Sequence, residues 1–115
     1  MSETTYNLLT ANNVDIDKGK EQFNNNVDLY LIFLKKFLEN DDIKDLAYHI
    51  RNENITQAVF SISALMAESE KLCIDCVSEQ IAQLKKNIDI NNLADARQTV
   101  EELERSISKI KDILN

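Results

Sequence analysis

The chain has 115 residues, 43% of them hydrophobic and 29% charged, a balance typical of one globular domain rather than of a disordered chain. Acidic residues outnumber basic ones by 20 to 13, and the formal net charge of −7 argues against nucleic acid or an anionic membrane as a partner, because both select basic surfaces. The chain contains no proline and a single glycine, which leaves little material for β-hairpin turns. The composition therefore predicts an all-α protein.

The N-terminus lacks the basic and then apolar pattern of a signal peptide, and no apolar run approaches the ~20 residues of a membrane span. Two cysteines, Cys73 and Cys76, are most simply reduced thiols in such a chain. We therefore expect a cytoplasmic protein.

The first part of the chain is expected to form a loose arm followed by a short helix. Residues 1–12 are polar and poor in capping groups, which predicts a flexible arm at the start of a single domain covering residues 1–115. Residues 13–23 favour a short helix that Gly19 weakens in its middle. The asparagine run 24–26 then breaks the pattern and can cap the helix that follows.

Residues 27–38 are apolar on nearly every side, which is typical of a helix buried on several faces. This pattern predicts a central helix of the domain. A third helix follows the cap at residues 40–42, with core positions at Ile43, Leu46 and Ile50.

The stretch 54–73 predicts a long amphipathic helix. Asn54 is a good N-cap residue, and Gln57 three positions later can complete a capping box with it. Its core stripe recurs at steps of three and four: Ile55, Ala58, Ile62, Leu65, Ser69 and Leu72. The opposite face is unusual because none of its residues carries a charge: Val59, Phe60, Ser63, Ala64, Met66 and Ala67. An uncharged outer face suggests that something other than water contacts it.

Two more helices are expected at residues 74–88 and 93–114, both with regular three-four spacing. The last has three heptads of apolar seam, which also allows a two-stranded coiled coil. We discount the coiled coil because three other helices need partners for their own stripes. Long helices with short connections favour an antiparallel up-down four-helix bundle over residues 40–114, with the two N-terminal helices packed over one end.

The run NNVDIDKGKEQFNNNVDLYLIFLKKFLENDDIKDL resembles the opening of the histidine-containing phosphotransfer (HPt) domain. In that family a short helix ending in an Arg-Phe-like pair precedes an apolar helix of the type LYLxxLxxF. Those features correspond here to residues 16–23 and 29–37. The resemblance covers roughly residues 13–114, rests on the order and spacing of the helices, and implies the HPt-like four-helix bundle.

The active stretch of the family is H-x-L-K-G or H-x-L-K-S, with a further glycine about ten residues after the histidine. The resemblance places Ser63 where the phospho-accepting histidine belongs and Met66 where the lysine belongs. It places Ala67 at the small residue and Cys73 at the later glycine, and it retains the buried leucine as Leu65.

These replacements argue against phosphotransfer at the site. Imidazole is nucleophilic at neutral pH and forms a reactive phosphoramidate, whereas a serine hydroxyl needs a nearby base and forms a stable ester. With methionine in place of lysine, no adjacent cation stabilises the phosphoryl group during transfer. We therefore expect a protein that is not an enzyme and needs no metal or cofactor.

In the family, the outer face of this helix and its neighbour docks receiver domains of response regulators or kinase domains. The resemblance therefore implies such a partner here, bound through Val59, Phe60, Ser63, Met66 and Ala67. The alternative for Val59 and Phe60 is that the N-terminal helices cover them.

Two other functional hypotheses remain. One is a helical-bundle scaffold or homo-oligomeric module outside two-component signalling, and the other, ranked last, is phosphotransfer through the only histidine, His49. His49 is not followed by a leucine-lysine-glycine run, which favours a partly exposed structural histidine.

The C-x-x-C of Cys73 and Cys76 lies near a helix start, where the helix dipole lowers a thiol pKa. A thioredoxin-like site needs a strand before it and a zinc site needs two more ligands, so core thiols are the favoured interpretation. The carboxylates show no spacing of a metal or acid–base site and are expected to form solvated acidic faces.

Overall fold

The computed structural model describes residues 1–115, and every regular element in it is helical, which confirms the all-α class. The elements in chain order are α1 Glu3–Ala11, α2 Ile16–Gly19, the 3-10 turn η1 Lys20–Phe23, α3 Val27–Leu38, α4 Asp41–Arg51, α5 Ile55–Lys71, α6 Asp75–Asp89 and α7 Leu93–Leu114. No helix is both long and apolar enough to cross a membrane.

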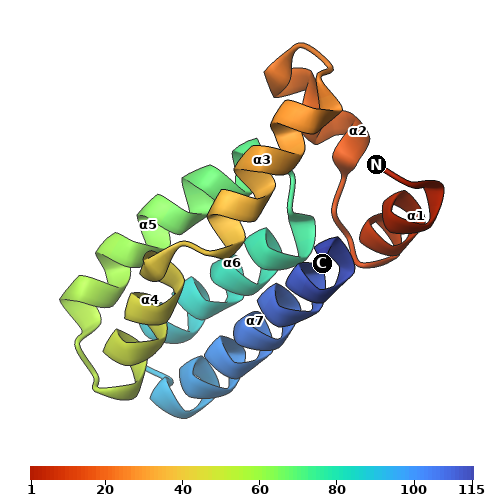
Figure 1. The fold of residues 1–115 in the computed structure, drawn as a ribbon. Helices are drawn as coiled ribbons and strands as arrows, with labels where there is room; N and C mark the ends of the chain where they lie inside the picture. Colours follow the sequence, from red (N-terminus) through yellow and green to blue (C-terminus); the bar gives the residue numbers. More distant parts are fainter.

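Helices α4 to α7 lie side by side and reverse direction at each short connection (Figure 1). Along the chain each packs against the next, and α4 also packs against α7, so that each of the four has two neighbours. The predicted stripes provide the buried contacts, including Ala58, Ile62 and Leu65 of α5. Helix α7 packs on α6, α4, α3 and α1, so its seam is used within the chain rather than in a coiled coil.

The connections are tight although they contain neither glycine nor proline. Glu53, Cys73 and Asn91 follow the ends of α4, α5 and α6 in the left-handed region, with φ of 58°, 54° and 57°. The next residue in each connection then donates its N–H to a carbonyl five positions back, from Asn54 to His49, from Ile74 to Ser69 and from Asn92 to Asn87. This is the Schellman arrangement, which satisfies the last carbonyls of a helix and reverses the chain.

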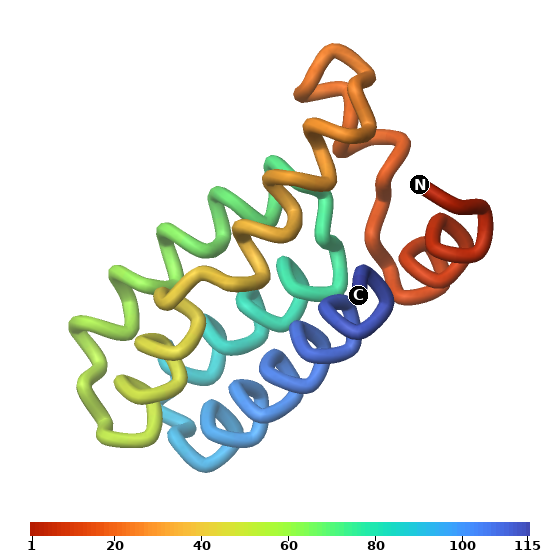
Figure 2. The backbone as a smooth tube through the Cα atoms, in the orientation of Figure 1, coloured from red at the N-terminus to blue at the C-terminus, as the bar shows by residue number.

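Helix α3 has the predicted boundaries, but the prediction that it is buried on several faces is wrong. One stripe is buried: Tyr30, Leu34, Phe37 and Leu38. Leu29, Ile32 and Phe33 are exposed, because α3 packs mainly against η1 and α7 at the edge of the molecule (Figure 2). The apolar excess of this segment therefore forms a surface rather than a core.

The prediction of a flexible arm over residues 1–12 also differs from the structure. Residues 3–11 form α1, capped by the Ser2 hydroxyl, which accepts from the N–H of Thr5. Leu9 is fully buried, and α1 packs against α7 and α2. A single buried leucine in a polar segment gives little periodic signal, and for this reason the sequence pattern did not predict the helix.

The segment 13–23 does not form one helix, since Asn13 is a left-handed turn residue with φ of 58° and the first helix of the segment, α2, begins only at Ile16. Residues 13 and 15 instead pair with the end of α5 and the start of α6. The N–H of Asp15 donates to the carbonyl of Cys73 at 2.9 Å, and the N–H of Cys76 donates to the carbonyl of Asn13 at 3.1 Å. These two bonds tie the N-terminal elements to the end of α5.

Gly19 has a packing role at this junction. The Tyr30 hydroxyl donates to the carbonyl of Leu72 at 2.7 Å, and Gly19 lies directly against both groups. A Cβ at position 19 would lie 2.7 Å from the Leu72 carbonyl oxygen and would overlap the Tyr30 ring. Only a residue without a side chain allows this approach.

Candidate functional surface on helix α5

The outer face of α5 is exposed and uncharged, as its sequence pattern predicts. Phe60 is 73% exposed and Val59 is 46% exposed, so the N-terminal helices do not cover either of them. Ser63, Ala64 and Ala67 are exposed, whereas Met66 is half-buried and packs against the core. The helix carries no charged side chain before Glu68, which leaves more than three turns without a charge.

The start of α5 differs from the predicted capping box. Asn54 is the N-cap residue, but its side chain accepts no hydrogen bond from the backbone of the first turn. Its amide Nδ2 lies instead 3.4 Å from Nδ1 of His49. The start of α5 is thus held to the end of α4 by side chains.

Ser63 lies near the middle of the exposed face of α5 and far from the only histidine. The only histidine, His49, is half-buried at the end of α4, where its ring meets Tyr48 edge-on. Ser63 is nine residues beyond Asn54, or about 13 Å further along the helix axis. His49 is therefore too far away to act as a base for Ser63.

The two cysteines do not form an activated pair. Cys73 is buried in the α5–α6 connection, Cys76 is half-buried in the first turn of α6, and both are free thiols. Burial raises the pKa of both thiols above their ordinary value. The lowering of a thiol pKa by the helix start, which the sequence allowed, is therefore outweighed by the loss of solvation.

No group of three or more His, Cys, Asp or Glu side chains is arranged to hold a metal ion. The carboxylates lie mainly on the surface, and two of them meet arginines across helices. Arg51 pairs with Glu104, and Arg97 pairs with Glu53. These ion pairs link α4 and the connection after it to α7. The two glutamates in them therefore have a structural role on the surface.

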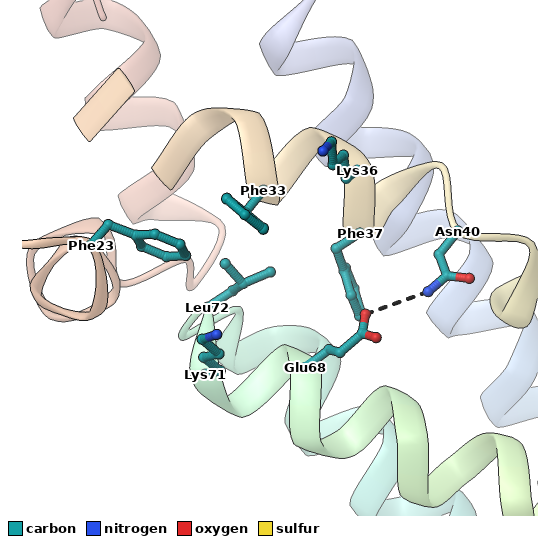
Figure 3. Close-up of a pocket in the computed structure, with 8 residues that line it drawn as sticks. All are labelled: Phe23, Phe33, Lys36, Phe37, Asn40, Glu68, Lys71 and Leu72. Atoms are coloured by element: carbon teal, nitrogen blue, oxygen red, sulfur yellow. Dashed lines mark hydrogen bonds between the residues drawn. The ribbon is translucent and has the colours of Figure 1, made fainter. Parts of the chain in front are cut away.

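The sequence patterns did not predict a groove at the C-terminal end of α5. It is a cavity of about 370 Å³ between η1, α3 and α5 (Figure 3). Its lining residues are Phe23, Phe33, Lys36, Phe37, Asn40, Glu68, Lys71 and Leu72. The one signal in the sequence was the surplus of apolar residues in α3, which we assigned to a core.

No protein-family model, curated protein or solved structure matches this chain. The function of the α5 face is therefore inferred from its residues and its geometry. Val59, Phe60, Ser63 and Ala67 share one exposed face, Met66 borders it, and Cys73 lies apart in the connection beyond the helix.

Proposed function

We propose that this chain is a non-catalytic, HPt-like interaction module of two-component signalling. In this proposal α4 to α7 are the antiparallel up-down four-helix bundle, and the outer face of α5 binds a receiver domain or a histidine-kinase domain without relaying phosphate. The observation that carries the proposal is the exposed, uncharged face of α5 with Ser63 near its centre. Exposed apolar patches of this kind are characteristic of protein–protein contacts.

Two further observations support the register of the resemblance. Cys73, which stands at the position of the family's later glycine, has a φ of 54°, a conformation that glycine adopts most readily. Leu65, which stands at the buried leucine of the motif, is fully buried. The burial of Leu65 and the left-handed backbone at Cys73 are therefore compatible with the proposed register, in which the reactive side chains are absent.

The inability to relay phosphate follows from the surroundings of Ser63. It lacks a neighbouring base, and the residue one turn along the same face, Ala67, is apolar. Met66, at the lysine position, packs against the core rather than presenting a cation. A phosphoryl group at Ser63 would meet neither an activating group nor a stabilising charge.

An NMR titration of the full chain with isolated receiver and histidine-kinase domains tests the proposal. We expect one of them to shift the resonances of Val59, Ser63 and Met66, and we expect Phe60→Ser to weaken its binding at least about tenfold. Ile90→Ser is the matched control, since Ile90 is 72% exposed but lies at the end of α6. The Ile90→Ser variant should bind the same domain with the affinity of the unmodified chain.

Three results would contradict the proposal. Acid-labile phosphate on His49 after incubation with a phosphorylated receiver would make the chain an active phosphotransfer protein. A dimer in sedimentation, with no resonance shifted by any receiver or kinase domain, would favour the homo-oligomeric scaffold. Equal weakening by Phe60→Ser and Ile90→Ser would show that the α5 face is not the binding surface.

A further inference from the structure

The groove between η1, α3 and the end of α5 has an aromatic floor. Phe23 and Phe33 stack with their ring centroids 5.0 Å apart, and Phe37 and Leu72 continue the floor toward α5 (Figure 3). Phe33 is 40% exposed, so a large apolar side chain faces solvent where the groove opens. A floor of this kind fits apolar side chains of a ligand.

The exposed face of α3 extends this floor. Leu29, Ile32 and Phe33 are all exposed, and their spacing of three and four residues places them along one side of the helix. Phe23 of η1 stacks on Phe33, and the stripe otherwise faces solvent. Together the groove and the stripe form an elongated apolar surface, the shape that an amphipathic helix occupies when it binds in a groove.

Two lysines line this surface, one from each side. Nζ of Lys36 on α3 lies 5.3 Å from the centroid of Phe33, and Nζ of Lys71 on α5 lies 5.8 Å from the centroid of Phe23. Neither lysine forms a salt bridge, although the chain has 20 acidic residues. The one carboxylate of the groove, Glu68, accepts a hydrogen bond from the Asn40 amide at 3.4 Å.

We propose that this groove binds an acidic amphipathic helix of a partner protein. Its apolar residues, spaced by three, four and seven, occupy the aromatic floor, and its carboxylates pair with Lys36 and Lys71. The two free cations supply charge complementarity in a protein whose net charge of −7 repels extended anionic surfaces. The charged side chains that line the groove are these two lysines and Glu68, so a short acidic peptide meets more positive than negative charge there. Carboxylates elsewhere on the protein are screened beyond about 8 Å at physiological ionic strength.

This inference does not depend on the proposed function. On α5 the groove is lined only from Glu68 to Leu72, beyond the uncharged face that ends at Ala67, and its aromatic residues come from η1 and α3. Substitutions on α3 therefore test the groove without changing the face around Ser63. A negative result for peptide binding in the groove therefore does not contradict the proposed function of the α5 face, and a negative result for that face does not contradict the groove.

A selection from a display library of random peptides against the full chain provides the test. We expect the enriched peptides to carry apolar residues at helical spacing with Asp or Glu beside them. In fluorescence anisotropy, Lys36→Glu and Lys71→Glu should each weaken an enriched peptide at least about tenfold, and added salt should weaken it further. Lys35→Glu is the matched control, because Lys35 is exposed on the same helix but does not line the groove.

The proposal is overturned if the library yields no enriched peptide, or if the enriched peptides are basic or lack apolar spacing. Equal effects of Lys35→Glu and Lys36→Glu would also overturn it, as would a peptide that shifts the resonances of Phe60 and Ser63 instead of Phe33 and Leu72. Self-association in sedimentation that Phe33→Ser abolishes would assign the groove to a second copy of the chain. Binding to anionic lipid vesicles that Lys36→Glu abolishes would assign it to a membrane.

Discussion

At the scale of single residues, the junction of Gly19, Tyr30 and Leu72 shows most clearly how distant parts of the chain depend on one another. Tyr30 is fully buried, and its hydroxyl supplies the hydrogen bond for a carbonyl at the end of α5, 42 positions along the chain. Gly19 leaves the space that this bond needs. This hydrogen bond therefore links α3 directly to the end of α5.

The substitution Tyr30→Phe should lower the free energy of unfolding by about 1–2 kcal/mol near neutral pH, because the Leu72 carbonyl loses its buried donor. Burial raises the pKa of Tyr30, so the folded protein keeps the phenol protonated above about pH 10, where the unfolded chain ionises it. The stability that Tyr30 provides is therefore complete below about pH 10 and declines as the pH rises further. Urea unfolding of both proteins at about pH 7 and about pH 11 measures this difference.

The difference in the free energy of unfolding between the unmodified protein and Tyr30→Phe should decrease as the pH rises, because phenylalanine does not titrate. The decrease is up to about 1.4 kcal/mol for each pH unit above the pKa of Tyr30 in the unfolded chain. Burial raises the pKa of Cys76 in both proteins, so its effect cancels from the difference. The charge of Cys73, in contrast, adds to the effect of burial in raising the pKa of Tyr30 and is part of the measured effect. A difference that stays constant up to about pH 11 would show that Tyr30 ionises equally in the folded and unfolded states.

At the scale of elements, α1 and α3 are the two helices whose roles the sequence pattern misrepresents, in opposite directions. The polar segment of α1 contributes a buried anchor, whereas the apolar segment of α3 leaves much of its surface in solvent. Helical periodicity identifies a stripe, but it does not tell whether another helix covers that stripe. For α3 the cover would have to come from outside the chain.

If α1 is an integral part of the fold, Leu9→Ala should destabilise the protein by about 2–4 kcal/mol, because it leaves a cavity against α7. Leu8→Ala is the matched control, since Leu8 is the adjacent leucine of the same helix and is 45% exposed. Its effect should lie within about 0.5 kcal/mol of zero. Denaturant unfolding of the two variants measures both values, and equal small effects would mean that α1 is detached in solution.

At the scale of the whole molecule, the backbone of α5 favours the proposed HPt-like fold, whereas its side chains argue against phosphotransfer. Leu65 of α5 is fully buried in the core, and Cys73 after the helix is left-handed; the proposed resemblance to HPt domains aligns these positions with a buried leucine and a glycine. The chain places serine, methionine and alanine where that family relays phosphate. Under the proposed resemblance, this combination is suited to binding rather than to group transfer.

The combined substitution Ser63→His, Met66→Lys and Ala67→Gly should therefore confer some phosphate acceptance. Incubation with a phosphorylated receiver domain and a test for acid-labile label measures it. Ala64→His in the otherwise unmodified chain is the matched control, because Ala64 is exposed on the same helix at the next position. It should remain unlabelled, and a well-folded triple variant without label would count against the proposed register.

The amino-acid sequence was enough to predict the helical class, the boundaries of α3 and α7, the core stripes and the uncharged face of α5. These features depend on composition, on caps such as Asn26 and Asn92, and on periodicity within one segment, all of which are local. The position of Ser63 on an exposed face was also predictable, because the core stripe of a helix shows which residues lie on the opposite side.

The packing of the helices against one another, and not the pattern of any single helix, determines which apolar side chains are covered. It buries Leu9 and Gly19, exposes Leu29 and Phe33, and brings α3 against the end of α5 to form the groove. Burial and close approach depend on residues that are far apart in the chain, and a pattern read along one helix contains no information about its neighbours. For that reason the α5 face could be predicted from the sequence, whereas the groove beside it became visible only in the folded chain.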